Sequence, residues 1–360
     1  MYEPENHSSP VYTNSLMQFS ILFAVAGFFA GRIAAVWAAS MIHEDIPTGL
    51  RECRACRQRF GFVRQMLSLT FRIRCAKCRA IDCSWPIAAS VISAAAFSIF
   101  AWLLVDQGCQ SVAEVQPSMK LWQNRLPFHL LFVFLLTTAT VADLLDYVIP
   151  DAIVIPGLLI AIAFATLSGE LQMIHVWVDW SYDGMVIPSP TDTEESIAHF
   201  GPYLPEWMKQ HQHLHGLAWS LCGLAAGAGI MWSGRLAAHV ILRMPAIGFG
   251  DVTLMAMIGA FMGWQPTLCV LAVAPLVGVV LGLGGHIVTG RSFVAFGPYL
   301  CFAAYIVLCT WRLLWEELQL KIIFSHWPTV TGMVAGAFAA YCLLLVGLQV
   351  FKAVPAEKLR

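Results

Sequence analysis

Apolar residues gather in long runs along the chain, and about nine of these runs approach the length of a membrane span. A transmembrane helix needs about 20 consecutive apolar residues. The pattern therefore predicts about nine spanning helices, of which the sixth is short, with an interfacial turn between the fifth and the sixth. The runs cover approximately residues 17–41, 87–105, 127–145, 152–168, 216–233, 251–264, 267–289, 295–315 and 329–351, and the turn lies within 234–247.

The composition points to the same class of protein. Hydrophobic residues make up 58% of the 360 residues, charged residues only 12%, and the mean hydropathy is +0.69. Soluble domains are far less apolar, so we expect an all-α polytopic membrane protein in contact with membrane lipid. The basic residues between 51 and 79 are better explained by topology and anionic lipid than by nucleic acid, for which we expect no binding.

Two segments interrupt the apolar pattern. Residues 43–86 are basic and contain cysteines, and residues 169–212 are acidic and contain Trp and Pro. Basic loops remain in the cytoplasm, so residues 43–86 are predicted to be cytoplasmic, with the N-terminus outside and the C-terminus inside. The acidic insert is then extracytoplasmic. We expect four parts: 1–42 with the first helix, the cytoplasmic segment 43–86, a membrane core 87–315 that carries the insert, and an additional helix and tail over 316–360.

Two cysteine pairs lie within the basic segment. Cys53 and Cys56 form one Cys-x-x-Cys pair, and Cys75 and Cys78 form another after eighteen intervening residues. This spacing is typical of a tetracysteine zinc ribbon, in which each pair holds one side of a tetrahedral ion. Disulfide pairing is the alternative, but a cytoplasmic segment is reducing. The spacing therefore predicts a zinc-ribbon-like insertion with a structural Zn(II).

Two aspartates stand beside helix breaks in an otherwise apolar context. Asp143 ends the third run shortly before Pro150, and Asp251 opens the sixth run after Gly248 and Gly250. Under the predicted topology both acids lie at the cytoplasmic side. Two close carboxylates in a site of low dielectric constant share a proton, which is the arrangement of the aspartic proteases. Glycine permits unusual backbone conformations and close approach, so we expect Gly248, Gly250 and Pro150 to line the path of an extended substrate.

Other interpretations of the same acids remain open. Each aspartate could instead cap a helix N-terminus, where a carboxylate is favourable. A transporter or channel could use Asp143 and Asp251 as proton or cation sites. In a third interpretation the chain is a catalytically silent assembly component whose zinc ribbon holds a secretion ATPase.

Two motifs around the acids carry a family resemblance. "DLLDYVIPD" (143–151) and "GFGDVTLMAMIGAFMGW" (248–264) resemble the two motifs of the type IV prepilin peptidases, the bacterial branch of the GxGD intramembrane aspartyl peptidases. The family's first aspartate stands seven residues before the proline, which selects Asp143. The resemblance implies an aspartic endopeptidase of the bacterial inner membrane. Such an enzyme cleaves the leader peptide of type IV prepilin-like or pseudopilin precursors at the cytoplasmic face, in contact with pilus or secretion assembly machinery.

Further stretches extend the resemblance over most of residues 17–315. "AGFFAGRIAAVWAA" (26–39) is similar to the glycine-rich first span of the family, and "FGPYL" (296–300) is similar to the Phe-Gly-Pro motif that opens a late span. The helix within 316–360 has no counterpart in the family pattern. The 169–212 insert is longer than usual.

Two positions depart from the family pattern. In the family, the cysteine segment belongs to a domain that also N-methylates the product with S-adenosylmethionine. This chain keeps Pro86 but has Ala88 and Ala89 where the family has a glutamate, so we expect cleavage without methylation. Thr253 replaces a lysine that commonly follows the second aspartate.

Alternate histidines open the fifth run. His211, His213 and His215 would share one face in an extended segment, where they could bind a metal. On a helix they would point in different directions. A solvated membrane edge is the simpler interpretation of this sequence.

Overall fold

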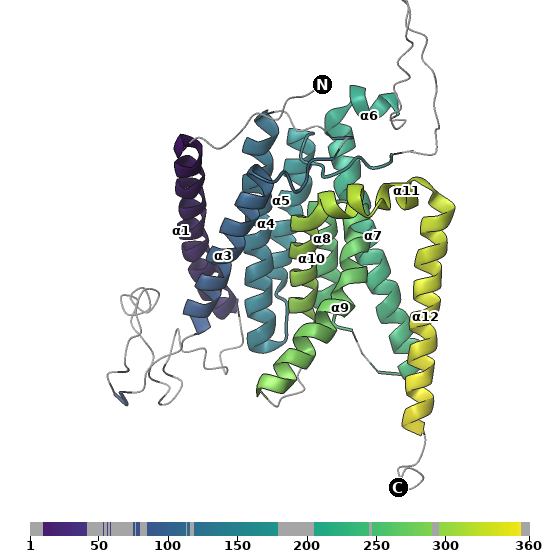
Figure 1. The fold of residues 1–360 in the computed structure, drawn as a ribbon. Helices are drawn as coiled ribbons and strands as arrows, with labels where there is room; N and C mark the ends of the chain where they lie inside the picture. Colours follow the sequence, from purple (N-terminus) through teal and green to yellow (C-terminus); the bar gives the residue numbers. More distant parts are fainter. Residues whose placement is uncertain are drawn as a thin grey trace, which may run out of the picture. The chain divides into compact units, whose positions relative to one another are not determined.

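The structure, a computed structural model, describes residues 10–41, 53, 56, 58, 75, 77–79, 85–112, 114–115, 119–178, 205–244, 247–289 and 295–353. Within these residues the chain is nearly all helical (Figure 1). The long helices are α1 (Pro10–Met41), α3 (Trp85–Val105), α4 (Met119–Asp146), α5 (Asp151–Ser168), α7 (Gln212–Leu242), α9 (Trp264–Thr289), α10 (Phe296–Arg312) and α12 (Trp327–Ala353). Shorter helices are α6 (Glu206–Gln210), α8 (Phe249–Met262), the π-helical turn η1 (Leu313–Glu317) and α11 (Leu320–Ser325).

The predicted membrane architecture is confirmed. Eight helices among the described residues are long and apolar enough to cross a membrane, and α8 is the short sixth element that the sequence predicted. Its 14 residues measure about 21 Å, less than the apolar core of a bilayer. One boundary was wrong. Residues 234–242 continue α7 as helix, so this helix ends about nine residues later than predicted.

The chain divides into two compact units. The first unit comprises residues 1–109, 122–154 and 274–305, and the second comprises 110–121, 155–273 and 306–360. In the first unit α1 and α3 pack along one another, with Gly31 of α1 facing the α3 backbone. A Cβ atom on Gly31 would lie 2.7 Å from the carbonyl oxygen of Ala89, so only glycine permits this approach.

In the second unit α8 packs against α7. A Cβ atom on Gly223 of α7 would collide with the carbonyl oxygen of Gly259 on α8, and a Cβ atom on Gly259 would collide with that of Gly223. Small residues at such crossings allow helix backbones to touch in membranes. Neighbouring segments enclose α8 almost completely, since its side chains at Leu254, Met255, Met257, Ile258 and Phe261 have no exposed surface. A helix too short to span alone is therefore covered by protein.

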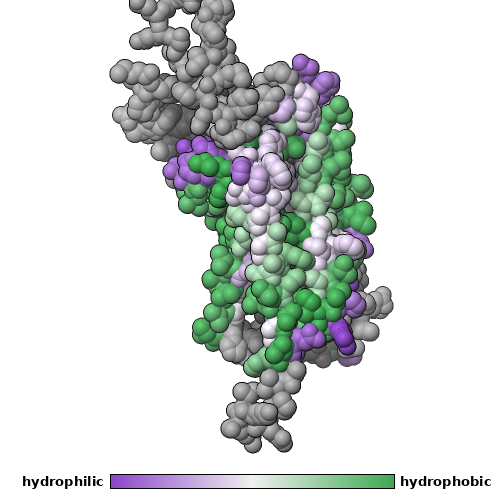
Figure 2. Space-filling model, turned by 90° about the vertical axis from the view of Figure 1, so that its right-hand side faces the viewer, coloured by the Kyte–Doolittle hydropathy of each residue, from purple (hydrophilic) through white to green (hydrophobic). Residues whose placement is uncertain are grey.

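The last long helix, α12, is the most exposed of the spanning helices. Only 6% of its most apolar stretch is buried in the protein, and the side chains of Leu343 and Leu344 are 72% and 74% exposed. On the face drawn in Figure 2, apolar side chains cover the middle and hydrophilic ones gather toward the ends. An apolar surface of this kind requires lipid around it.

The described beginning of the 169–212 insert is fastened to the second unit. Trp264 Nε1 donates a hydrogen bond of 2.6 Å to the carbonyl oxygen of Val176, and Gln265 Nε2 donates one of 2.8 Å to that of His175. The N–H of Val176 donates to His215 Nε2 at 3.2 Å. Side chains from the first turns of α7 and α9 thus hold residues 169–178 in place, while residues 179–204 lie outside the described part of the chain.

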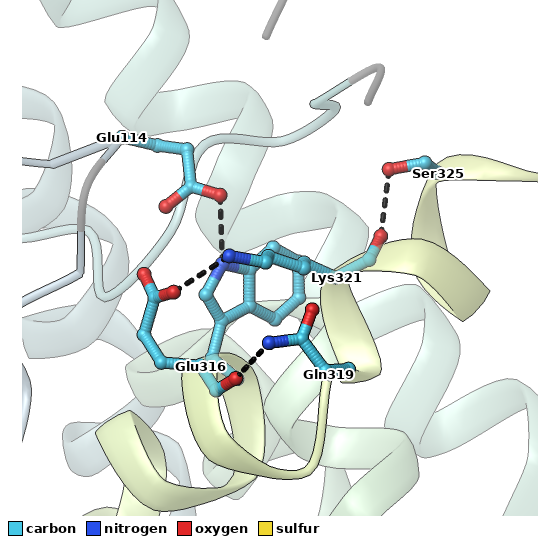
Figure 3. A network of polar contacts seen from close by, with 6 residues as sticks. Glu114, Glu316, Gln319, Lys321 and Ser325 are labelled. Atoms are coloured by element: carbon cyan, nitrogen blue, oxygen red, sulfur yellow. Dashed lines mark hydrogen bonds and ion pairs between the residues drawn. The ribbon is translucent and has the colours of Figure 1, made fainter. Parts of the chain in front are cut away.

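A polar network precedes α12 (Figure 3). Trp315 Nε1 of the π-helical turn donates to Glu114 Oε1 at 2.8 Å, and Lys321 Nζ forms an ion pair of 2.7 Å with Glu316. Ser325 Oγ donates to the carbonyl oxygen of Lys321 at 2.6 Å. The side chain of Trp315 is almost fully buried. The network therefore orders the connection between α10 and the additional helix.

Candidate active site and metal centre

Asp143 lies in the last turn of α4 and is 6% exposed. Its Oδ2 atom accepts a hydrogen bond of 3.1 Å from the backbone N–H of Gly297, the second residue of α10. Free N–H groups and the helix dipole make a helix N-terminus a favourable place for a carboxylate. A Cβ atom on Gly297 would lie 2.6 Å from Asp143 Oδ2, so a larger residue at this position would displace the carboxylate. The "FGPYL" stretch was recognised in the sequence, but its contact with Asp143 was not.

The chain breaks between α4 and α5 as the sequence predicted. Tyr147 adopts a left-handed backbone conformation with φ of 55°, and its N–H donates to the carbonyl oxygen of Asp143 at 2.9 Å. Pro150 is half-buried, and its carbonyl oxygen accepts the N–H of Ile153 in the first turn of α5. The side chain of Asp151 is exposed. The break leaves Asp143 as the buried acid of this segment.

Asp251 lies in the first turn of α8 and is half-buried. Its Oδ2 atom accepts the N–H of Gly248, the N-cap residue, at 3.2 Å. This pair closes the helix N-terminus by the carboxylate half of a capping box. The cap interpretation therefore describes the local geometry of Asp251 correctly. The same hydrogen bond keeps the Asp251 carboxylate in a defined position, so the cap does not rule out a catalytic role.

The expectation about the glycines was wrong in one respect. Gly248 has φ of −65° and ψ of 149°, and Gly250 is helical, so neither uses a conformation closed to other residues. Their place in a substrate path remains a prediction. The dyad remains a prediction as well, because Asp143 belongs to the first unit and Asp251 to the second.

The four predicted cysteines come together in a cluster with the geometry of a metal site. Their Sγ atoms all lie within 4.8 Å of one another, with 3.4 Å between Cys53 and Cys78 and 3.6 Å between Cys56 and Cys75. A tetrahedral zinc with Zn–S bonds of about 2.3 Å separates its thiolates by about 3.8 Å. All four are free thiols rather than disulfides. The donor set and its spacing therefore fit Zn(II).

Backbone groups prepare one of these thiols for metal binding. The N–H groups of Cys78 and Lys77 lower the pKa of the Cys75 thiol to about 6. Thiolates, not thiols, coordinate metals. Most of the surrounding segment 43–86 lies outside the described residues, so its extent as a domain stays a prediction.

The alternate histidines do not form an extended metal-binding face. His213 and His215 belong to α7, and His211 immediately precedes it. His213 Nδ1 pairs with the carbonyl oxygen of Thr166 at 2.8 Å, whereas His215 accepts the N–H of Val176. The two side chains thus have separate structural partners.

Comparison with known proteins identifies the part of the chain around Asp251. Residues 203–283 match the model of the type IV leader peptidase family. Curated relatives named prepilin leader peptidase/N-methyltransferase include that of Aeromonas salmonicida (strain A449), 34% identical over 92 residues, which are 25% of this chain and 32% of the relative. The protein of the same name from Escherichia coli (strain K12) is 31% identical over 88 residues, 24% of this chain and 39% of the relative.

A longer match extends to Pseudomonas putida. Its prepilin leader peptidase/N-methyltransferase is 24% identical over 212 residues, 57% of each chain. The present chain spans about a third of the length of the Aeromonas relative and over half of that of the Pseudomonas one. No solved structure matches significantly. The family match contains α7, α8 and the Gly-Phe-Gly-Asp sequence, which confirms the resemblance drawn from the sequence: residues 203–283 of this chain are similar to the type IV leader peptidase family.

Proposed function

We propose that the chain is an aspartic endopeptidase of the bacterial inner membrane that removes the leader peptide from type IV prepilin-like or pseudopilin precursors. The family match over α8, whose first turn contains Asp251, carries this proposal. The names of the curated relatives supply the substrate class. A second acid, the buried Asp143, is held at another helix N-terminus and supports the chemistry.

The proposed reaction uses the two carboxyl groups in different protonation states. The ionised carboxylate takes a proton from a water molecule, and the water oxygen adds to the carbonyl carbon of the scissile amide. The protonated carboxyl group gives its proton to the carbonyl oxygen. Collapse of the tetrahedral intermediate breaks the C–N bond: the carboxyl group that was protonated by water gives its proton to the leaving nitrogen, and a hydroxyl of the gem-diol returns a proton to the other carboxylate, which restores both acids. In such a dyad the two carboxyl groups titrate as a pair, so the role of base is not assigned to either acid alone.

In this proposal, the substrate reaches the acids at the helix breaks, one after Asp143 and one before Asp251. A leader segment has to be extended before its amide can be attacked, and extended chains pair with irregular backbone. The backbone at Pro150, Gly248 and Gly250 would provide such pairing. In this proposal the N-terminus is outside, the C-terminus is cytoplasmic, and cleavage takes place at the cytoplasmic face, where assembly machinery receives the product.

The Cys53–Cys56–Cys75–Cys78 centre has a structural role in this proposal. Four thiolates fill the coordination sphere of zinc and leave no open position for a water or substrate. Zinc would therefore order the cysteine segment and shape the entrance on the cytoplasmic side. We further propose that the chain does not use S-adenosylmethionine, because Ala88 and Ala89 replace the expected glutamate.

Cleavage of a co-expressed prepilin tests the proposal directly. Membranes that contain this chain as their only peptidase should shorten the precursor. Asp143→Asn and Asp251→Asn should each abolish cleavage at matched protein level, because an amide neither accepts the proton from water nor donates as an acid. Asp146→Asn and Asp151→Asn are the matched controls and should have milder effects.

Each alternative function makes a different forecast in the same assay. A transporter, a channel or a silent assembly component would leave the precursor intact in all membranes. Processing that persists in Asp143→Asn or Asp251→Asn would exclude the dyad even if the precursor is cleaved.

A further inference from the structure

The turn that precedes Asp251 is held from the side by a cation on α7. Arg235 Nη1 donates a hydrogen bond of 2.9 Å to the carbonyl oxygen of Ile247. The guanidinium carbon of the same side chain lies 5.6 Å from the centroid of the Phe249 ring, a cation–π contact. Arg235 is half-buried and twelve residues away from Ile247 in sequence. One side chain thus contacts the residues before and after Gly248.

These contacts lie on both sides of Gly248, whose N–H group holds the Asp251 carboxylate. Gly248, between the two residues that Arg235 contacts, donates its N–H to Asp251 Oδ2. A hydrogen bond from a charged donor is stronger than one between neutral groups. Movement of the turn would move the Gly248 N–H and, with it, the carboxylate. Arg235 thus contacts Asp251's supporting turn at Ile247 and Phe249.

The additional helix α12 contacts the same region of α7 and the turn. Tyr341 Oη donates to the carbonyl oxygen of Gly234, the neighbour of Arg235, at 3.4 Å. A Cβ atom built on Gly234 would have the Tyr341 ring at 3.8 Å and the Ile247 side chain at 3.9 Å. Helix α7, helix α12 and the turn thus meet around Gly234 and Arg235.

We propose that Arg235 is a positioning residue that fixes the Gly-Phe-Gly-Asp turn so that the Asp251 carboxylate is held in its reactive place. The proposal rests on the proposed function, since it assigns Arg235 a part in the same reaction. In sequence, Arg235 is only a basic residue that follows an apolar run. In the structure, Arg235 also makes a hydrogen bond and a ring contact, which a residue that only sets the membrane topology does not need.

Purified enzyme with a prepilin substrate provides the test. Arg235→Met keeps the apolar stem but removes the donor and the charge. Misplacing a reacting group by about 1 Å costs about 10²-fold in rate, so we expect kcat to fall by about 10- to 100-fold while KM changes by less than about twofold. Arg235→Lys keeps a cation and a donor and should recover most of the lost kcat.

Arg243→Met is the matched control. Arg243 is exposed on the same turn region and contacts α7 through its backbone N–H to His239. It should leave kcat within about twofold of the wild type. Membrane orientation, measured by labelling single cysteines from each side, should be unchanged in all three variants.

The outcomes separate this inference from the proposed function. If Asp251→Asn abolishes cleavage while Arg235→Met retains full kcat, the positioning role is wrong and the peptidase proposal stands. Equal losses in Arg235→Met and Arg243→Met, or no recovery in Arg235→Lys, would also overturn it. Should Arg235→Met fail to insert, Phe249→Leu removes only the ring contact: a lower kcat at unchanged KM supports the proposal, and an unchanged kcat contradicts it.

Discussion

Asp143 Oδ2 accepts the backbone N–H of Gly297 at 3.1 Å, although 154 residues separate the two in sequence. The contact joins the end of α4 to the beginning of α10 within one compact unit. Asp251 has the corresponding contact within its own helix, from the N–H of Gly248. Both predicted catalytic acids therefore accept an N–H group at the N-terminus of a helix.

The contact predicts a large effect of a single methyl group. In Gly297→Ala the new Cβ atom would lie 2.6 Å from Asp143 Oδ2 and 3.0 Å from the Ile149 side chain. The carboxylate would have to move, and we expect cleavage to fall by about 10²-fold. Initial rates of precursor cleavage at matched enzyme concentration measure this.

Gly332→Ala is the control for that substitution. Gly332 lies on α12, and within the described part of the chain no atom beyond its own stretch of helix lies within 4 Å of the position of a Cβ atom. Alanine is favoured over glycine in a helix by about 1 kcal/mol, so this variant should remain active and no less stable. Full activity in Gly297→Ala would show that the carboxylate does not need its present position.

Metal analysis should find one tightly bound zinc per chain. Cys53→Ser together with Cys75→Ser should remove it, since each substitution takes one thiolate from a different pair. Elemental mass spectrometry of the purified protein measures the content. Cys222→Ser, which changes an exposed cysteine on α7, should keep the zinc. Cleavage should decrease only in part, because the closed centre is structural; a metal-free wild-type protein would contradict the assignment.

In the proposed reaction, the product should carry an unmethylated N-terminus. Ala88 and Ala89 replace the glutamate that the family pattern predicts for methyl transfer. Mass spectrometry of pilin processed with this chain as the only peptidase, in the presence of S-adenosylmethionine, decides the matter. The Aeromonas salmonicida relative, named as an N-methyltransferase, is the positive control. A product heavier by one methyl group would show that another residue replaces the glutamate.

Acid should weaken the fastened loop around His175. Burial lowers the pKa of His175, with an opposing contribution from its hydrogen bond to the Glu114 carbonyl oxygen. An unfolded histidine has a pKa of about 6.5, so below that pH the unfolded chain binds more protons than the folded one. The free energy of unfolding therefore decreases as the pH falls below about 6.5 and on through the lower, folded pKa.

Thermal unfolding in detergent at about pH 7.5 and about pH 5.5 checks this expectation. His175→Gln keeps a side-chain N–H donor but does not titrate. Its loss of stability on acidification should be smaller than that of the wild type. An equal loss in both proteins would place the acid sensitivity elsewhere.

The features that local sequence determines were predicted correctly. Each membrane helix depends on about 20 apolar residues in succession, and the predicted runs correspond to α1, α3, α4, α5, α7, α9, α10 and α12, with α8 as the short one. The two Cys-x-x-Cys pairs predicted a cluster of four thiols, because each pair supplies one edge of the coordination tetrahedron of a metal ion. The cap of Asp251 also needs only residues three positions apart.

Tertiary structure decided the contacts that no local pattern contains. The fifth apolar run was predicted to end at residue 233, whereas α7 continues to Leu242. The partner of Asp143 at Gly297 and the contact of Arg235 with Ile247 depend on which helix ends meet after packing. Helices in lipid gain little from hydrophobicity alone and associate through close packing and hydrogen bonds. Those interactions arise between residues distant in sequence, so the sequence determined the helices and the candidate acids, and the packed structure determined what holds each acid in place.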